Sequence, residues 1–176
     1  ALPICKSLYT LKIPSKLQRI SDYTFSKCIS LTEIKIPGNI REIGYKSFSG
    51  CSGLREISIP STVKTVGIGA FENCTELKDI SLPTTLTEIN YYTFSGCTSL
   101  TTLTLHSKLT AINNYAFAGC KSLTEIHCKN SNPPLIGENT FRDVNRIGCK
   151  IFVPSKRAKK SYSTALYWNE FTIYIE

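Results

Sequence analysis

The sequence of 176 residues predicts an α/β solenoid, a coil of 23-residue repeats with a parallel sheet along one wall. Three observations predict it. Cysteine recurs every 23 residues, at Cys5, Cys28, Cys51, Cys74, Cys97 and Cys120. Several apolar columns keep the same step along the chain. The pattern changes only after about residue 130, where a different segment is expected to close the coil.

One wall of the coil is predicted by three apolar columns with the spacing Leu-x-x-Leu-x-Leu. They are Leu8, Leu31, Leu54, Leu77, Leu100 and Leu123; Leu11, Ile34, Ile57, Ile80, Leu103 and Ile126; and Ile13, Ile36, Ile59, Leu82, Leu105 and Cys128. This spacing is typical of the strand in a leucine-rich repeat, so a right-handed leucine-rich-repeat-like coil is expected. Proline lacks the donor N–H, and it ends the strand at Pro14, Pro37, Pro60 and Pro83.

The other wall is predicted by a second set of columns. They are Leu17, Ile40, Val63, Leu86 and Leu109; Ile20, Ile43, Val66, Ile89 and Ile112; and Phe25, Phe48, Phe71, Phe94 and Phe117. One repeat cannot bury these side chains alone, but stacked repeats can. Two further columns, rich in Gly and Asn, are expected to hold left-handed backbone at corners: Ser21, Gly44, Gly67, Asn90 and Asn113; and Lys27, Gly50, Asn73, Gly96 and Gly119.

The end of the chain departs from the repeat. Lys129 replaces the proline, Asn132-Pro133-Pro134 follows, and Ile136 and Phe141 come one residue late. A strand at 151–153, a helix over 156–165 with Ser155 as its N-cap, and the apolar residues Trp168, Phe171, Ile173 and Ile175 follow. We therefore divide the chain into a solenoid of about six repeats (1–141), cut through a repeat at its N-terminus, and a strand-helix-strand cap (142–176) that covers the last repeat.

The formal charge is +8, and the basic residues are densest near the C-terminus. Residues 1–127 carry 13 Lys and Arg against 9 Asp and Glu, and residues 128–176 carry 8 against 4. A basic run, Lys156, Arg157, Lys159 and Lys160, falls on one face of the predicted helix. A solvated helix face is the favoured interpretation, and electrostatic binding of polyanions is the alternative. No specific nucleic-acid binding is expected, and no apolar run is long enough to enter a membrane.

The residue types that form catalytic or metal sites in other proteins occupy structural positions of the repeat in this sequence. Six cysteines in one column are expected to form a reduced, buried ladder, because stacked thiols point the same way; Cys128 and Cys149 are the only candidates for a pair. The adjacent His127 and Cys128 point to opposite faces of a strand and cannot share a metal ion. Gly67-Ile68-Gly69 begins like a dinucleotide-binding loop, and Asn73-Cys74-Thr75 matches a glycosylation sequon. Gly67 and Asn73, however, are corner positions of the repeat. We predict no catalytic residue, no metal and no cofactor.

A partner is expected to bind side chains that alternate with the buried strand positions on a concave sheet surface. The candidate residues are Glu33, Lys35, Glu56, Asp79, Thr102, Glu125 and His127. Their acidic row suits a basic protein patch, and solubility of an exposed sheet is the alternative. Tyr23, Tyr45, Tyr91, Tyr92 and Tyr115 are expected to form a layer over the Phe column, with an interface role as the alternative.

The segments Ile36–Leu54 and Ile59–Leu77 each read Ile-Pro-x-x-Val/Ile-x-x-Val/Ile-x-x-x-x-Phe-x-x-Cys-x-x-Leu. This motif resembles the BspA-like class of leucine-rich repeats, and the segment from Phe152 to Phe171 is similar to the tail that often follows such repeats. The resemblance implies a secreted or surface-attached bacterial protein, noncatalytic, that adheres to host or extracellular matrix proteins. We also expect a monomer. Similar repeats occur in some protozoan surface proteins. A structural spacer within a longer surface protein is the alternative function.

Overall fold

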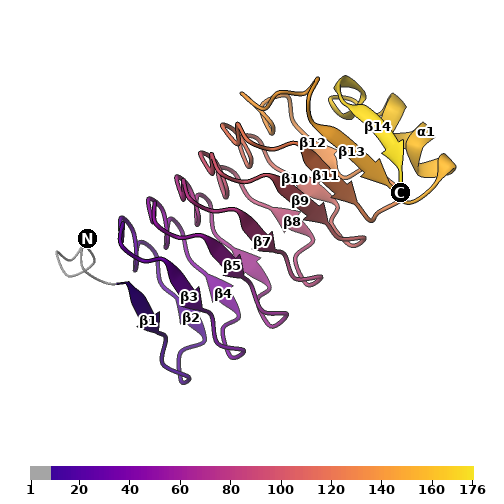
Figure 1. The fold of residues 1–176 in the computed structure, drawn as a ribbon. Coiled ribbons are helices and arrows are strands. Elements are labelled where there is room, and N and C mark those ends of the chain that lie inside the picture. The colour runs from indigo at the N-terminus through magenta and orange to yellow at the C-terminus, as the bar shows by residue number, and fades with distance from the viewer. Residues whose placement is uncertain (1–8) are drawn as a thin grey trace.

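A computed structural model describes residues 9–176, which form a coil of stacked rungs with a strand on each of two walls (Figure 1). The first wall, whose outer surface we call the long-strand face, contains β1 (Thr10–Lys12), β3 (Glu33–Lys35), β5 (Glu56–Ser58), β7 (Asp79–Ser81), β9 (Thr102–Leu105), β11 (Glu125–Cys128), β13 (Lys150–Val153) and β14 (Thr172–Ile175). The second wall contains β2 (Arg19–Ile20), β4 (Glu42–Ile43), β6 (Thr65–Val66), β8 (Glu88–Ile89), β10 (Ala111–Ile112) and β12 (Leu135–Ile136).

The pairing of the strands follows the 23-residue step. All the pairs are parallel, and Thr10 lies opposite Glu33 as Glu56 lies opposite Asp79. Near the C-terminus the step lengthens to 24 residues, since Ala111 pairs with Leu135. The extra residue is an insertion that precedes β12. The predicted parallel solenoid is therefore confirmed, including the late register of its last repeat. Leu2, Cys5 and Leu8, which the sequence places in the first columns, lie outside the described residues.

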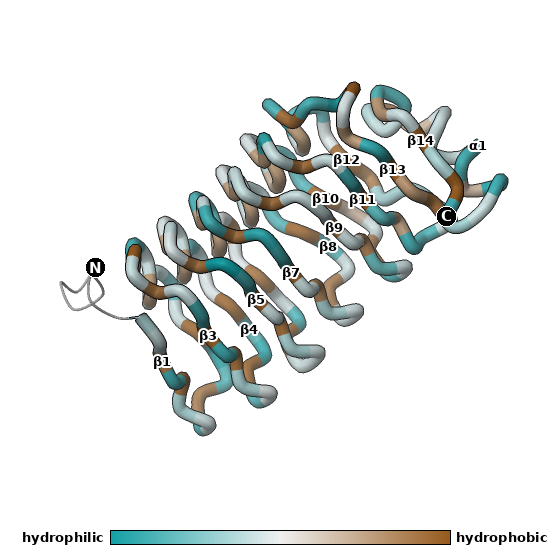
Figure 2. Tube along the Cα trace, viewed as in Figure 1, coloured by the Kyte–Doolittle hydropathy of each residue, from teal (hydrophilic) through white to brown (hydrophobic). Residues whose placement is uncertain are grey.

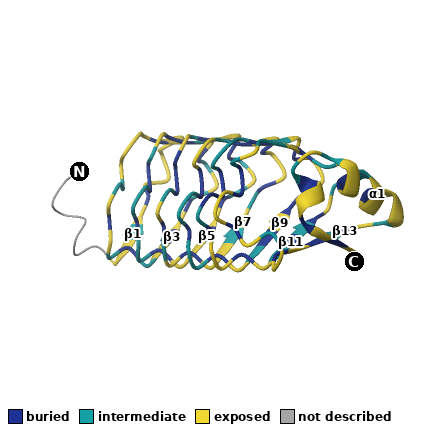
Figure 3. Ribbon diagram, turned by 90° about the horizontal axis from the view of Figure 1, so that it is seen from above, coloured by how far each residue is buried: buried dark blue, intermediate teal, exposed yellow. Residues whose placement is uncertain are grey.

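The predicted columns form one continuous core between the two walls. In Figure 2 apolar residues recur at the same places in successive rungs, and in Figure 3 the buried positions line up along the coil. Leu31, Leu54, Val63 and Phe71 are fully buried. Leu17 is an exception, since 46% of its surface is exposed. It belongs to the first rung that the structure describes in full, where only Ile40 extends its column.

The phenylalanines form a stacked ladder through the core. Successive ring centroids from Phe25 to Phe141 lie 5.2 to 5.6 Å apart, and from Phe48 onward the planes are within 12° of parallel. The rings of Trp168 and Phe171 meet Phe141 edge-on, at 5.8 and 5.6 Å between centroids. The edge-on contact is a favoured aromatic geometry, and it ends the ladder with buried apolar surface.

The cysteine column packs behind this ladder as a set of hydrogen-bond donors. Each of four thiols donates to the carbonyl of a phenylalanine in the preceding rung, with Sγ to O distances of 3.0 to 3.4 Å: Cys51 to Phe25, Cys74 to Phe48, Cys97 to Phe71 and Cys120 to Phe94. A cysteine is small enough for this buried column and still satisfies a main-chain acceptor. Sequence reasoning predicted the burial but missed the hydrogen bond.

The predicted reduced state of the column is confirmed for Cys51, Cys74, Cys97 and Cys120, which are free, and it is wrong for Cys28, which is disulfide-bonded. The prediction assumed that every thiol of the column points the same way, and this assumption fails at position 28. The alternative pair also does not form, since Cys128 and Cys149 are both free.

One of the two corner columns is displaced from its predicted place. Left-handed backbone is confirmed at Lys27, Gly50, Asn73, Gly96 and Gly119. It is absent from the column of Gly44 and Gly67, and occurs two residues later, at Tyr23, Lys46, Gly69, Tyr92 and Tyr115. A Cβ on Gly67 would lie 2.6 Å from the carbonyl carbon of Gly44, so glycine at position 67 allows close approach of two rungs rather than a positive φ.

The C-terminal segment closes the coil. Helix α1 (Lys156–Thr164) begins after Ser155, whose Oγ accepts a hydrogen bond from the Ala158 N–H as predicted. A short 3-10 helix, η2 (Trp168–Glu170), leads into β14, which pairs with β13 and so ends the sheet. Residues 130–134, where the repeat lengthens, supply acceptors for this segment. Tyr162 donates its hydroxyl to the Asn130 carbonyl, and Trp168 donates its indole N–H to the Pro134 carbonyl at 2.8 Å.

The coil runs nearly straight, so the expected concave surface is not strongly curved (Figures 1 and 3). Both walls are built from parallel strands with the same 23-residue step, and parallel strands lie about 4.8 Å apart wherever they pair. The two walls therefore rise by the same distance per rung. A layer of helices on the second wall would make that wall wider than the first and bend the coil. The second wall consists of short strands, so the coil stays straight.

Candidate functional site

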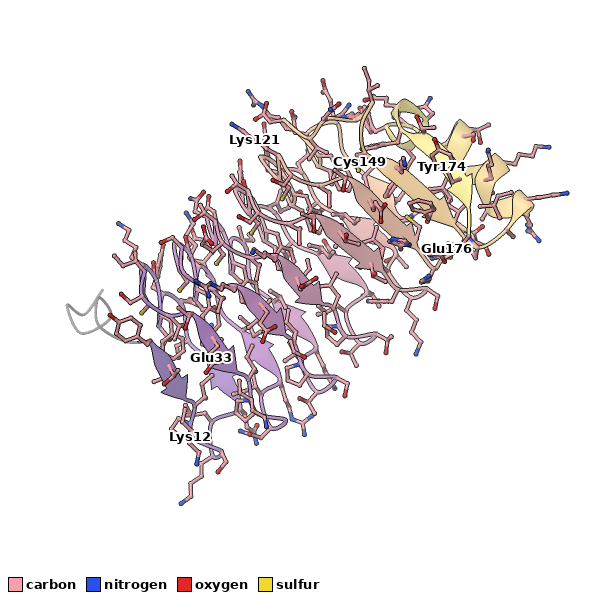
Figure 4. The ribbon with its side chains drawn as sticks, viewed as in Figure 1. Lys12, Glu33, Lys121, Cys149, Tyr174 and Glu176 are labelled. Carbon is pink, nitrogen blue, oxygen red and sulfur yellow. The ribbon has the colours of Figure 1, made fainter. Side chains whose placement is uncertain are left out.

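The long-strand face presents the side chains that the sequence nominated for binding. Strand residues alternate across the sheet, so in β3 Ile34 is buried while Glu33 and Lys35 are exposed, and β5 repeats the pattern. Figure 4 shows Glu33 on this face, with Lys12 toward the end of β1. Each strand thus contributes two outward positions, and stacking aligns them in two rows.

An open groove of about 840 Å³ runs across β1, β3, β5 and β7 on this face. Its lining includes the candidates Glu33, Lys35, Glu56 and Asp79, together with Ser58 and Ser81. The structure therefore brings four of the seven candidate residues into one hollow. Thr102, Glu125 and His127 lie on β9 and β11 of the same wall, outside the groove.

The carboxylates of the groove have no ionic partner in the described part of the chain. Among residues 9–176, the salt bridges involve none of Glu33, Glu56 and Asp79, and Lys35 is not paired with Glu33. Exposed carboxylates without partners keep their full charge for an external cation. Lys35 lies beside Glu33 on the same strand, but the two side chains form no ion pair.

At the other end of the face, His127 belongs to an aromatic row that sequence reasoning missed. Its ring stacks on Phe152 at 4.9 Å, and Phe152 packs against Tyr174 at 5.7 Å between centroids. The three residues are register partners on β11, β13 and β14. The steps between them are not 23 residues, so the repeat could not align them. The only available signal was their place in the middle of predicted strands.

The last residue, Glu176, anchors this row (Figure 4). One carboxylate oxygen lies 2.5 Å from His127 Nδ1, and the other accepts a hydrogen bond from Lys129. The hydrogen bonds from Lys129 and His127 lower the pKa of Glu176 below its ordinary value. At neutral pH the charged carboxylate therefore links the end of β14 to β11. At this end of the face the charged groups pair with one another, whereas the carboxylates of the groove do not.

The tyrosines lie at the surface and form two separate pairs on neighbouring rungs. Tyr23 and Tyr91 are 52% and 44% exposed, and Tyr45 and Tyr92 are each 37% exposed. The rings contact one another: Tyr23 meets Tyr45 edge-on at 5.2 Å, and Tyr92 stacks on Tyr115 at 4.9 Å. The Phe rings from Phe48 to Phe141 are almost fully buried, so the prediction that tyrosines cover them remains a prediction.

The chemistry of the buried thiols is that of core residues. Burial raises the pKa of Cys51 and of Cys120 to about 12, and raises that of Cys74 and Cys97 well above its ordinary value. A protonated thiol is a poor nucleophile and a poor metal ligand. Within the described part of the chain, no group of three or more His, Cys, Asp or Glu residues is arranged to hold a metal ion. No helix of residues 9–176 is long and apolar enough to cross a bilayer.

Comparison with solved structures finds bacterial proteins of the same fold. A leucine rich cell surface protein from Faecalibacterium prausnitzii A2-165 is 25% identical, with a TM-score of 0.66. A leucine-rich repeat protein from T. pallidum is 28% identical with a TM-score of 0.64, and one from Eubacterium ventriosum is 27% identical with a TM-score of 0.62. The curated proteins compared with the chain gave no match.

The matches cover most of this chain but only part of each relative. They include 94%, 68% and 82% of this chain, and 51%, 58% and 45% of the three structures in the same order. A family model described as "BspA type Leucine rich repeat region (6 copies)" matches residues 3–124 and 45–169. These matches span nearly the whole sequence. The chain therefore belongs to the BspA type leucine-rich repeat family.

Proposed function

We propose that the chain is a noncatalytic protein-binding module of a cell-surface or secreted bacterial protein, and that it binds through the groove of the long-strand face. The observation that carries the proposal is the set of unpaired carboxylates, Glu33, Glu56 and Asp79, which line one hollow. Extended faces of solenoids commonly bind partners. The cell-surface description of the F. prausnitzii relative supports the location.

The chemistry of the groove favours a basic protein segment. Three carboxylates line it against a single lysine, Lys35, and the serines Ser58 and Ser81 add hydroxyl groups that donate and accept hydrogen bonds. A basic host or extracellular matrix protein fits this charge. Nucleic acid does not, because its phosphates would meet carboxylates. We expect the module to act as a monomer.

Binding to a panel of basic and acidic extracellular matrix proteins tests the proposal. The variant Glu33→Gln/Glu56→Gln/Asp79→Asn removes three charges from the groove and should weaken binding of a basic partner at least tenfold. The matched control Glu76→Gln/Glu88→Gln/Glu138→Gln removes three charges from exposed positions outside the groove and should leave binding within twofold. Equal loss in both variants, or no binding by the unmodified chain, would contradict a groove on this face.

A structural spacer is the second candidate, and the straight axis of the coil favours it (Figure 3). A rod of stacked rungs can carry another domain away from a surface without any partner of its own. The parent protein discriminates between the two functions. Many additional repeats together with a separate binding domain, and no binding by residues 1–176, would support the spacer over the module.

A further inference from the structure

We propose that the outer face of helix α1 binds a linear sulfated polysaccharide, at a site separate from the groove. The site consists of Lys156, Arg157, Lys159 and Lys160, and we call it the basic cap face. All four side chains are exposed at the C-terminal end of the coil. At that end of Figure 4, nitrogen-tipped side chains project away from the body of the protein.

The four cations form one continuous surface. At 3.6 residues per turn they fall within an arc of about 160° around the helix. Ala158 and Tyr162, on the opposite side, are buried against the rest of the segment. Lys156 is three and four residues from Lys159 and Lys160, so these ammonium groups are neighbours along the helix surface. The helix is nine residues long, or about 13 Å, enough to meet several charges of a linear polymer.

No acidic group of the described chain neutralises this face. Helix α1 itself contains no acidic residue, and no salt bridge among residues 9–176 involves any of the four cations. The nearest acidic residues in the sequence after the helix are already engaged, Glu170 with Arg146 and Glu176 with Lys129 and His127. The full charge of the basic cap face is therefore open to an external anion.

The arrangement opposes the stability of the helix. Lys156 and Arg157 occupy the first turn, where the helix dipole favours anions, and no acidic residue balances them. Like charges three and four residues apart also repel. Solubility alone would be served equally well by cations spread along the coil. A cluster that costs stability where it stands points to a ligand that removes the repulsion.

A sulfated polysaccharide fits this face better than the other polyanions. Single-stranded nucleic acid binds by stacking its bases on aromatic rings, but helix α1 has no exposed aromatic side chain, since its one aromatic residue, Tyr162, is buried, and the exposed Tyr174 lies on β14. An interfacial helix inserts an apolar face into the membrane, but the apolar side of α1 is packed against the cap. Short stretches rich in Lys and Arg are typical of both nucleic-acid and heparin patches, and a sulfated polysaccharide needs neither exposed rings nor an apolar face.

The test measures binding of a size-defined heparin oligosaccharide to the 176-residue chain at low and physiological salt. The variant Lys156→Gln/Arg157→Gln/Lys159→Gln/Lys160→Gln should weaken binding at least tenfold, with a helix of nearly unchanged propensity because Gln, Lys and Arg are similar helix formers. The control Lys64→Gln/Lys78→Gln/Lys108→Gln/Lys121→Gln makes the same change in net charge at exposed positions elsewhere and should bind within threefold of the unmodified chain. Lys156→Arg/Lys159→Arg/Lys160→Arg should retain binding.

Desulfated heparin, a DNA duplex and phosphatidylserine vesicles serve as competing ligands, and each should bind at least tenfold more weakly than heparin. Circular dichroism and thermal unfolding confirm that each variant is folded. Three results would overturn the proposal: no binding of heparin by the unmodified chain, equal loss in the two glutamine variants, or preference for the duplex or the vesicles. Because the groove is unchanged in all of these variants, the result is independent of the proposed protein-binding function.

Discussion

At the scale of single residues, the repeat places equivalent residues of successive rungs in one column, where they share one physical role. The cysteine column is the clearest case, because each thiol satisfies a phenylalanine carbonyl of the rung before it. Where one residue departs from its column, the departure can be tested. His106 stands in the proline column, and its carbonyl accepts from the Leu109 N–H just as the Pro83 carbonyl accepts from the Leu86 N–H.

Cys97→Ala should lower the free energy of unfolding by about 0.5–1.5 kcal/mol, because the Phe71 carbonyl loses the thiol donor and keeps only the Cys74 N–H. Urea unfolding followed by circular dichroism measures the change. Cys97→Ser keeps a donor at the same position and should be closer to the unmodified chain. If the alanine variant were as stable as the parent, the thiol would be only a space-filling group.

His106→Pro should raise stability by about 0.4–1 kcal/mol at pH 7, since proline matches the turn used in the other rungs. It also removes a buried Nε2 that has no hydrogen-bond partner among the described residues. Burial lowers the pKa of His106 below its ordinary value of 6.5. The unfolded chain therefore binds the proton first, and stability is lost as the pH falls through 6.5.

Urea unfolding of both proteins at pH 7 and pH 5 checks this effect. The parent should lose more stability than His106→Pro on going from pH 7 to pH 5. The ion pairs of Glu176 do not interfere, because their contribution is lost only as the pH falls through the lowered pKa of that carboxyl. Equal losses in the two proteins would show that His106 is not the titrating group.

At the scale of elements, the C-terminal segment packs against the last rung of the coil. β13 and β14 extend the sheet, and Trp168 and Phe171 cover the last ring of the Phe ladder. The sequence predicts that the regular repeat ends near residues 130–134. Carbonyl groups of this segment accept hydrogen bonds from Tyr162 and Trp168. We propose that residues 142–176 are a cap on a solenoid of residues 1–141, and that Trp168 is its central contact.

Trp168→Ala should lower the free energy of unfolding by about 3–5 kcal/mol, because it opens a cavity against Phe141 and leaves the Pro134 carbonyl without its donor. Denaturant unfolding measures the loss. Leu166→Ala, at a position 69% exposed, is the control and should change stability by less than about 0.5 kcal/mol. A similar small change in both variants would exclude Trp168 from the core of the cap.

At the scale of the whole molecule, each rung contacts mainly the rungs beside it, so stability is expected to be a sum of nearest-neighbour terms. The same geometry keeps the coil straight, and it separates the acidic groove from the basic cap face. The two proposed sites can therefore be altered independently. Cooperativity between rungs is best tested in the middle of the Phe ladder.

Phe71→Ala removes a ring stacked between Phe48 and Phe94 and should cost about 3–5 kcal/mol. Because coupling passes from rung to rung, the variant should unfold in a broader or divided transition by calorimetry. Ile68→Ala, at an exposed position of the same repeat, should keep a single transition. A loss under about 1 kcal/mol, or one sharp transition, would contradict a ladder that joins the two halves of the coil.

The sequence by itself determined the 23-residue step, the two walls, the buried columns, the N-cap of the helix and the strand, helix and strand at the C-terminus. It could do so because a repeated residue in a stacked coil meets the same environment in every rung. Four of the candidate binding residues were also placed together by this periodicity alone, since it fixes which side chains share a row.

Only the tertiary structure decided the features that depend on contacts between rungs or on steps of other lengths. The equal rise of both walls keeps the coil straight, and close approach of rungs explains Gly67 without a positive φ. The thiol hydrogen bonds depend on main-chain carbonyls of the neighbouring rung, whose positions the sequence does not show. The row of His127, Phe152 and Tyr174 forms across irregular connections, where periodicity no longer aligns the chain.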